Sequence, residues 1–86
     1  MKIKFTNNEI ILSHLFLRIA LKKDDIIDVS IPEDYAPSNA LLIGSYLKGK
    51  DTVMLHTKKQ NYYFYIDGDA RMFVKKVEDF LQGNLK

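Results

Sequence analysis

The sequence predicts a mainly β fold in which about seven antiparallel strands form two packed sheets and one C-terminal helix closes them. Two observations predict this fold. Apolar and polar residues alternate from residue 2 to about residue 66, which is the period of a strand with one buried face. From about residue 69 to residue 82 the apolar residues recur every three or four positions, which is the period of a helix. Because the chain has only 86 residues, we expect residues 1–86 to form a single domain.

The first two strands are expected at 2–6 (KIKFT) and 9–13 (EIILS). Asn7 and Asn8 would form the tight turn between them, since asparagine tolerates positive φ. A third strand is expected at 15–21 after a break near Ser13 and His14. Its inward residues would be Leu15, Leu17, Ile19 and Leu21.

A polar turn and a proline-bearing loop frame the fourth strand. KKDD (22–25) is expected to form one helical turn before a strand at 26–31. Alternation would place Ile27, Val29 and Ile31 on one face. Pro32 ends this strand, and the segment 33–39 (EDYAPSN) is the connection expected to cross between the sheets.

The second half of the chain predicts a three-stranded meander formed by ALLIGSYL (40–47), TVMLHT (52–57) and YYFYI (62–66). In the last of these strands, Phe64 belongs with Tyr62 and Ile66 on the core side. Tyr63 and Tyr65 would then lie half-exposed on the other face.

The helix is expected at about 69–82, with Asp67 or Asp69 as its N-cap and Gly83 as its C-terminal stop. Phe73, Val77 and Phe80 should anchor it to the sheets. The full apolar stripe consists of Ala70, Phe73, Val74, Val77, Phe80 and Leu81.

Four strands, a crossing loop, three strands and a helix follow each other in the order of a pleckstrin-homology-like barrel. IALKKDDIIDVSI (19–31) resembles a pattern of small bacterial domains of that type. NALLIGSYLKGKDTVMLHTKKQNYYFYI (39–66) resembles the central part of the sublancin immunity protein family. The resemblance implies a non-enzymatic binding module that acts at the cytoplasmic membrane surface or in self-protection against a bacteriocin.

Catalytic and metal-binding patterns are weak in this sequence. There are no cysteines, and His14 and His56 are far apart and lack a third zinc ligand in sequence. The segment DGDARM (67–72) supplies two carboxylates, which is too few for a calcium loop. Hydrolase and phosphate-binding motifs are missing. We therefore expect a protein that is not an enzyme and that uses no metal or cofactor.

The net charge of +2 is small, so the placement of the lysines matters more than their number. In an up-and-down strand path, three turns would meet at the open end of the barrel, and Lys48 and Lys50 would lie elsewhere. The candidate residues for contact with anions or a membrane in these turns are Asn7, Asn8, Lys22, Lys23, Lys58 and Lys59. Solvated turns without a ligand are the alternative.

The alternative function is a self-associating interaction domain. Its candidate interface residues are Tyr35, Tyr46, Tyr63 and Tyr65, since tyrosine is enriched at interfaces. Nucleic acid is not favoured as a partner, because the aromatic strand lacks the glycine-rich signature of RNA-recognition sheets. The expected partner is thus a protein, an anionic membrane surface or a second copy of the chain.

The expected location is the cytoplasm or the inner face of the membrane. The apolar run at 10–21 is interrupted by Ser13, His14 and Arg18, and it is shorter than the roughly 20 residues of a membrane span. The N-terminal segment MKIKFTNNE lacks the apolar core of a signal peptide.

Overall fold

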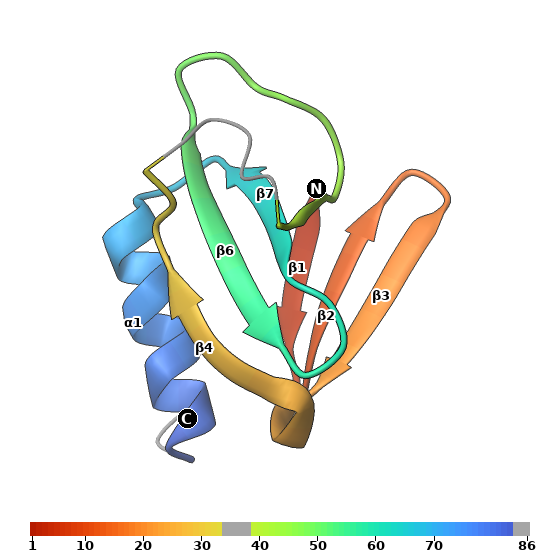
Figure 1. Cartoon of the computed structure of the whole chain (residues 1–86), viewed down its shortest axis with the longest axis vertical. Helices are drawn as coiled ribbons and strands as arrows, with labels where there is room; N and C mark the ends of the chain where they lie inside the picture. The colour runs from red at the N-terminus through yellow and green to blue at the C-terminus, as the bar shows by residue number, and fades with distance from the viewer. Residues whose placement is uncertain (34–38, 84–86) are drawn as a thin grey trace.

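The computed structural model describes residues 1–33 and 39–83. In these residues seven strands, one short 3-10 helix and one α-helix follow each other in the predicted order (Figure 1). The elements are β1 (Lys2–Phe5), β2 (Glu9–His14), β3 (Leu17–Lys22), η1 (Lys23–Asp25), β4 (Ile26–Ser30), β5 (Leu41–Leu42), β6 (Asp51–Thr57), β7 (Tyr62–Ile66) and α1 (Ala70–Leu81).

The first sheet is an antiparallel β1-β2-β3 meander. The turn at Asn7 and Asn8 is confirmed, and the hydroxyl of Thr6 accepts a hydrogen bond from the Glu9 N–H at 3.0 Å. Neither asparagine has the positive φ on which the prediction rested, since Leu15 is the single described non-glycine residue with positive φ. The predicted break near Ser13 was placed too early, because β2 continues to His14 and pairs there with Leu17. Leu15 is therefore a turn residue and does not belong to the third strand.

The second sheet has four strands in the order β4-β6-β7-β5, so the strands divide three and four. The chain crosses between the sheets at η1, between β3 and β4. The prediction that 33–39 makes this crossing is wrong, and residues 34–38 of that loop lie outside the described part of the chain. A polar turn of three residues is enough to reverse the chain, because the Lys58 N–H donates to the Asp25 carbonyl oxygen at 2.9 Å and holds η1 against the second sheet.

The predicted meander at the end of the chain is also wrong in one strand. β6 pairs with β4 along one edge and with β7 along the other, so no edge of β6 remains for β5. β5 instead pairs with β7 in parallel, and the N–H groups of Leu41 and Ile43 donate to the Asn61 and Tyr63 carbonyl oxygens. Strand structure covers only Leu41–Leu42, far less than the predicted 40–47.

A register shift between Ile26 and Asp28 changes the inward residues of β4. Ile26 and Val29 are buried, whereas Ile27 and Ile31 are exposed. The predicted grouping of Ile27 with Val29 on one face fails because a bulge adds one residue between Ile26 and Asp28 and changes the alternation. Ile31 is exposed beyond the end of β4 at Ser30.

Helix α1 matches the prediction closely. The Asp69 carboxylate accepts a hydrogen bond from the Arg71 N–H at 2.8 Å, and Gly83 has the positive φ of a helix stop, 78°. Val77 and Phe80 are buried, and Phe73 packs half-buried against the same cluster. The predicted anchoring by these three side chains is confirmed.

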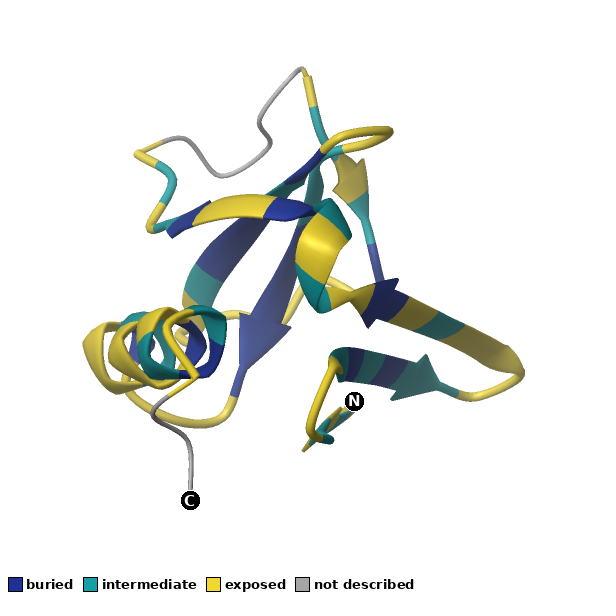
Figure 2. Ribbon diagram, turned by 90° about the horizontal axis from the view of Figure 1, so that it is seen from below, coloured by how far each residue is buried: buried dark blue, intermediate teal, exposed yellow. Residues whose placement is uncertain are grey.

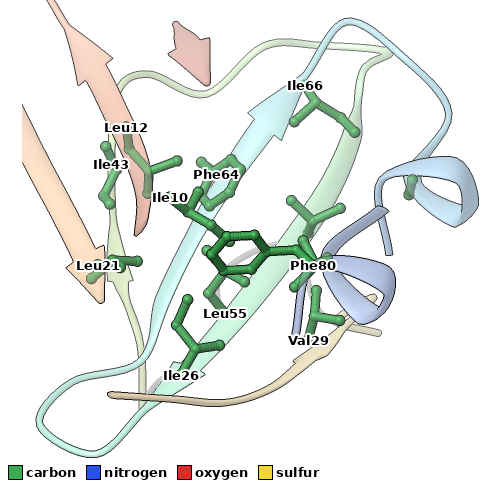
Figure 3. Close-up of a cluster of buried hydrophobic side chains, with 13 residues drawn as sticks. Ile10, Leu12, Leu21, Ile26, Val29, Ile43, Leu55, Phe64, Ile66 and Phe80 are labelled. Carbon is green, nitrogen blue, oxygen red and sulfur yellow. The ribbon is translucent and has the colours of Figure 1, made fainter. Parts of the chain in front are cut away.

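The helix and the two sheets share one core, whose centre is shown in Figure 3. The aromatic ring of Phe80 points into it beside Ile10, Leu55 and Val29 (Figure 3). Figure 2 shows the buried side of the helix facing this core and the exposed side facing away. The helix lies along the side of the two sheets, near β1 of one and β4 of the other. The described strands form two packed sheets, not a closed barrel, and one of their pairings is parallel.

Candidate functional site

The three turns that carry the candidate lysines meet at one end of the molecule, as the strand parity predicts (Figure 1). The Lys23 N–H donates to the Asn8 carbonyl oxygen at 2.8 Å, which joins the first turn to η1. The Lys58 N–H in turn donates to the Asp25 carbonyl oxygen at 2.9 Å. The C-terminal end of the helix lies at this end as well, and a hollow beside it is lined by Thr6, Asn7, Lys23, Phe80 and Gly83.

The lysines of these turns do not form an undivided positive cluster. Lys23 is partly buried, and its Nζ lies over the Phe80 ring, 5.4 Å from the ring centroid. Lys58 and Lys59 are exposed, but η1 adds the carboxylates of Asp24 and Asp25 to the same end. Asp24 and Asp25 therefore reduce the positive potential of the four lysines at this end, Lys22, Lys23, Lys58 and Lys59. Anion binding here stays a prediction.

Lys50 and Lys48 belong to the connection before β6, as the sequence predicts, away from the lysine-bearing turns. The Lys50 Nζ lies 3.4 Å from the Asp67 Oδ1 in an exposed ion pair. Asp67 was one of the two candidate N-caps, and Asp69 is the residue that caps.

The candidate interface tyrosines differ in how far they are exposed. Tyr63 and Tyr65 are only 8% and 6% exposed, so the expectation of two half-exposed rings is wrong. They pack with Met54, Ala40 and Leu42 on the side of the second sheet that faces away from the main core. Tyr46 is 56% exposed, and its ring lies edge-on to that of Tyr65, with centroids 5.2 Å apart. Tyr35 lies outside the described residues.

The two histidines have separate environments. The Nε2 of His56 is 2.9 Å from the Ser30 Oγ across the β4–β6 pair, whereas the His14 ring lies beside Gly44. Within residues 1–33 and 39–83, no three side chains of the metal-binding types are arranged to share an ion.

The outer surface of the first sheet is a basic region that the sequence reading missed. Ile10, Leu12 and Leu21 are buried, so the alternate residues of these strands point outward. The register sets Lys2, Ser13 and Arg18 in one row across the sheet. We call this surface the basic sheet face; its side chains are Lys2, Lys4, Glu9, Ile11, Ser13, Arg18, Ala20 and Lys22.

The basic sheet face carries a clear surplus of positive charge. Its charged residues are four cations and Glu9, which leaves a formal surplus of three. Lys2, Lys4, Arg18 and Lys22 are all exposed. The signal was present in the sequence, because Lys2, Lys4 and Arg18 occupy polar positions of the predicted strands; Lys22 was a candidate residue, but it was assigned to the turn at 22–25 and lies at the end of β3. Single cations on alternate strand positions are usual on any solvent-facing strand, so the pattern alone does not distinguish a binding face from an ordinary surface.

A helix that could cross a membrane is absent from the described residues.

Comparison with known proteins identifies the family. Residues 1–79 match the family model described as the SunI-like bacterial PH domain, where PH stands for pleckstrin homology. The chain is also similar to a UPF0457 protein of Bacillus cereus (strain ZK / E33L), with 32% identity over 66 residues, which is 73% of this chain and 79% of the relative. No solved structure matches the chain. The resemblance seen in the sequence is confirmed, and the chain belongs to the SunI-like bacterial pleckstrin-homology domain family.

Proposed function

We propose that this protein is a non-enzymatic binding module that attaches peripherally to an anionic membrane surface at the inner face of the membrane. The observation that carries the proposal is the surplus of three positive charges on the basic sheet face. Membership of a pleckstrin-homology family agrees with it, since domains of this type are generally non-catalytic. The cations lie on a regular sheet, so backbone hydrogen bonds already fix the spacing of the residues that carry them. The backbone therefore loses little conformational freedom on binding.

The basic sheet face suits an anionic surface better than the lysine-bearing turns do. Lys2 and Arg18 flank the neutral Ser13, and strands lie about 4.8 Å apart, so the two cations lie on the order of 10 Å from each other. Lipid phosphates in a fluid membrane can adjust to such a spacing. At the turns, by contrast, Asp24 and Asp25 would be brought toward the same phosphates and would be repelled.

The expected attachment is weak and sensitive to salt. A Lys or Arg near an anionic membrane contributes about 1 kcal/mol, so a surplus of three charges contributes about 3 kcal/mol. The Debye length is about 8 Å at physiological ionic strength, which screens cations that do not approach the surface closely. Charge alone would therefore hold the domain only transiently.

Co-sedimentation with vesicles of equal parts phosphatidylglycerol and phosphatidylcholine tests the proposal. The variant of the basic sheet face is Lys2→Glu, Lys4→Glu and Arg18→Glu, and the variant of the turns is Lys23→Glu, Lys58→Glu and Lys59→Glu. A third variant with the same change in net charge, Lys48→Glu, Arg71→Glu and Lys75→Glu, places the reversals on other exposed surfaces. We expect only the first variant to lose most of its binding at low salt.

The outcomes separate the proposal from its competitors. Loss of binding only in the turn variant would move the site to the lysine-bearing end. Equal loss in all three variants would mean that net charge alone matters, and the absence of wild-type binding would contradict the membrane proposal. In that last case, light scattering over a concentration series tests the second candidate, self-association through the exposed Tyr46.

We propose self-protection against a bacteriocin as the process that this attachment serves, because the chain belongs to a SunI-like family. Sensitive cells that express the chain should survive the bacteriocin better than cells with an empty vector. If the attachment matters, the variant of the basic sheet face should protect less than the matched third variant.

A further inference from the structure

The tip of the β2–β3 hairpin is apolar and projects from the body of the protein (Figures 1 and 2). Leu15 and Phe16 form its two-residue turn, between the paired residues His14 and Leu17. Leu15 is 88% exposed, Phe16 is fully exposed, and Leu17 is 46% exposed. Three consecutive apolar side chains thus lie in solvent at the most protruding point of a sheet.

The turn itself disfavours these residues. Leu15 has φ 54°, and it is the single non-glycine residue with positive φ in the described part of the chain. A two-residue hairpin turn with positive φ at its first position normally has glycine there, because a Cβ in that conformation is strained. A soluble tip would also be polar. Neither the Leu15 nor the Phe16 side chain is buried in the fold, and a strained residue in an exposed turn is an observation from which a functional role can be inferred.

The surroundings of the tip are basic. The nearest row of the sheet holds Lys2 and Arg18, and the next outward cation is Lys4. Glu9, the acidic residue of the basic sheet face, lies at the other end of β2. A hollow beside the tip is lined by Met1, Lys2, Ser13, His14 and Leu15, so polar side chains face it from the level just below the apolar turn.

We infer that the Leu15–Phe16 tip inserts into the acyl layer of an anionic membrane while Lys2 and Arg18 contact the lipid phosphates. This inference rests on the proposed function, and it names the part of the chain that enters the lipid. An apolar point with two cations in the adjacent row of the sheet matches the order of layers in a membrane, with acyl chains below phosphates. A protein partner fits less well, because the tip is a few side chains wide and a stable protein interface needs about 800 Å² on each partner.

Tryptophan fluorescence tests the insertion directly, because the chain contains no tryptophan. Phe16→Trp would place the single reporter at the tip, and Met72→Trp would place it at an exposed apolar position on the helix. With the phosphatidylglycerol vesicles, we expect a blue shift and quenching by brominated acyl chains for Phe16→Trp. The Met72→Trp protein should bind equally but show neither effect.

The apolar contribution is measured by a Leu15→Ser, Phe16→Ser variant, whose vesicle binding is compared with that of the wild type at increasing salt. Losing two inserted side chains should lower the partition coefficient by more than about tenfold. The remaining binding should disappear at moderate salt, and the unfolding midpoint should not fall, because both residues point outward.

The results distinguish the inference from the proposed function. If vesicles bind through the basic sheet face but Phe16→Trp shows neither the shift nor the quenching, insertion is overturned and electrostatic attachment stands. If the Leu15→Ser, Phe16→Ser variant binds vesicles with the same partition coefficient as the wild type, insertion is overturned in the same way. If wild-type protein binds no vesicles, the proposed function fails and the insertion fails with it.

Discussion

The ring of Phe5 on β1 lies edge-on to the ring of Phe80 on α1, with centroids 5.5 Å apart and an interplanar angle of 71°. This contact joins the N-terminal strand to the C-terminal helix. Phe73 extends it, because its ring contacts both Phe5 and Phe64. The helix therefore holds the edge of the first sheet as well as covering the second.

Truncation of Phe80 should destabilise the protein strongly. Phe80 is 1% exposed, so Phe80→Ala would leave a cavity between helix and sheets and cost about 3–5 kcal/mol. Phe73→Ala should cost less, because Phe73 is only half-buried. Urea unfolding followed by circular dichroism measures both. A Phe80→Ala protein that unfolds at the wild-type midpoint would contradict the central packing role of the helix.

The start of the helix depends on two carboxylates from different elements. Asp69 accepts from the Arg71 N–H, and Asp51 at the start of β6 accepts from the Ala70 N–H, both at 2.8 Å. We expect Asp69→Ala and Asp51→Ala each to lower the free energy of unfolding by about 1 kcal/mol. Asp67→Ala is the control, since it removes only the exposed ion pair with Lys50 and should cost less than about 0.5 kcal/mol. Equal costs for Asp67 and Asp69 would contradict this assignment of the cap.

Leu15→Gly should stabilise the fold and weaken its binding to membranes. Glycine removes the strain of a Cβ at φ 54°, which is worth about 1 kcal/mol. Leu15→Ala is the matched control, because it removes the apolar side chain but keeps the strain. Thermal unfolding should separate the two variants, whereas vesicle binding should fall in both. If Leu15→Ala is as stable as Leu15→Gly, the turn does not carry the strain inferred for it.

The sequence was sufficient for the elements whose pattern is local. Helix α1 could be predicted from residues within or next to it. These are the apolar residues Phe73, Val77 and Phe80 at spacings of three and four, the N-cap Asp69 and the stop Gly83. The position of the hairpin at Asn7 and Asn8 is equally local, because the alternation on either side places the reversal there, although neither asparagine adopts the positive φ that was expected.

The errors arose where structure depends on distant pairing. β5 pairs with β7 because β4 and β7 already occupy both edges of β6. The residues 40–47 themselves carry no sign of this pairing. The bulge after Ile26 changes which residues of β4 face inward, and the sequence has no glycine there to indicate a bulge. Tyr63 and Tyr65 are covered by a segment that includes Leu42 and Tyr46, so alternation alone could not predict their burial.

For the candidate site, parity predicted the meeting of the turns but not the apolar tip. Leu15 and Phe16 were predicted to begin the third strand, because the break between strands was placed earlier, near Ser13 and His14. Only the pairing of His14 with Leu17 shows that the chain reverses there. The absence of glycine or asparagine that hid the turn is also the observation from which we infer a role for the tip.

The orientation of the domain on a membrane is the most direct test of the central claim. Isotope-labelled protein is mixed with phosphatidylglycerol bicelles that carry a paramagnetic lipid headgroup, and the loss of amide signal intensity is measured residue by residue. We expect the greatest losses at Ser13, Leu15, Phe16 and Arg18, with Lys58 and Lys59 little affected. Losses centred on Lys58, Lys59 and Lys23, or spread evenly over the surface, would contradict attachment through the basic sheet face and the hairpin tip.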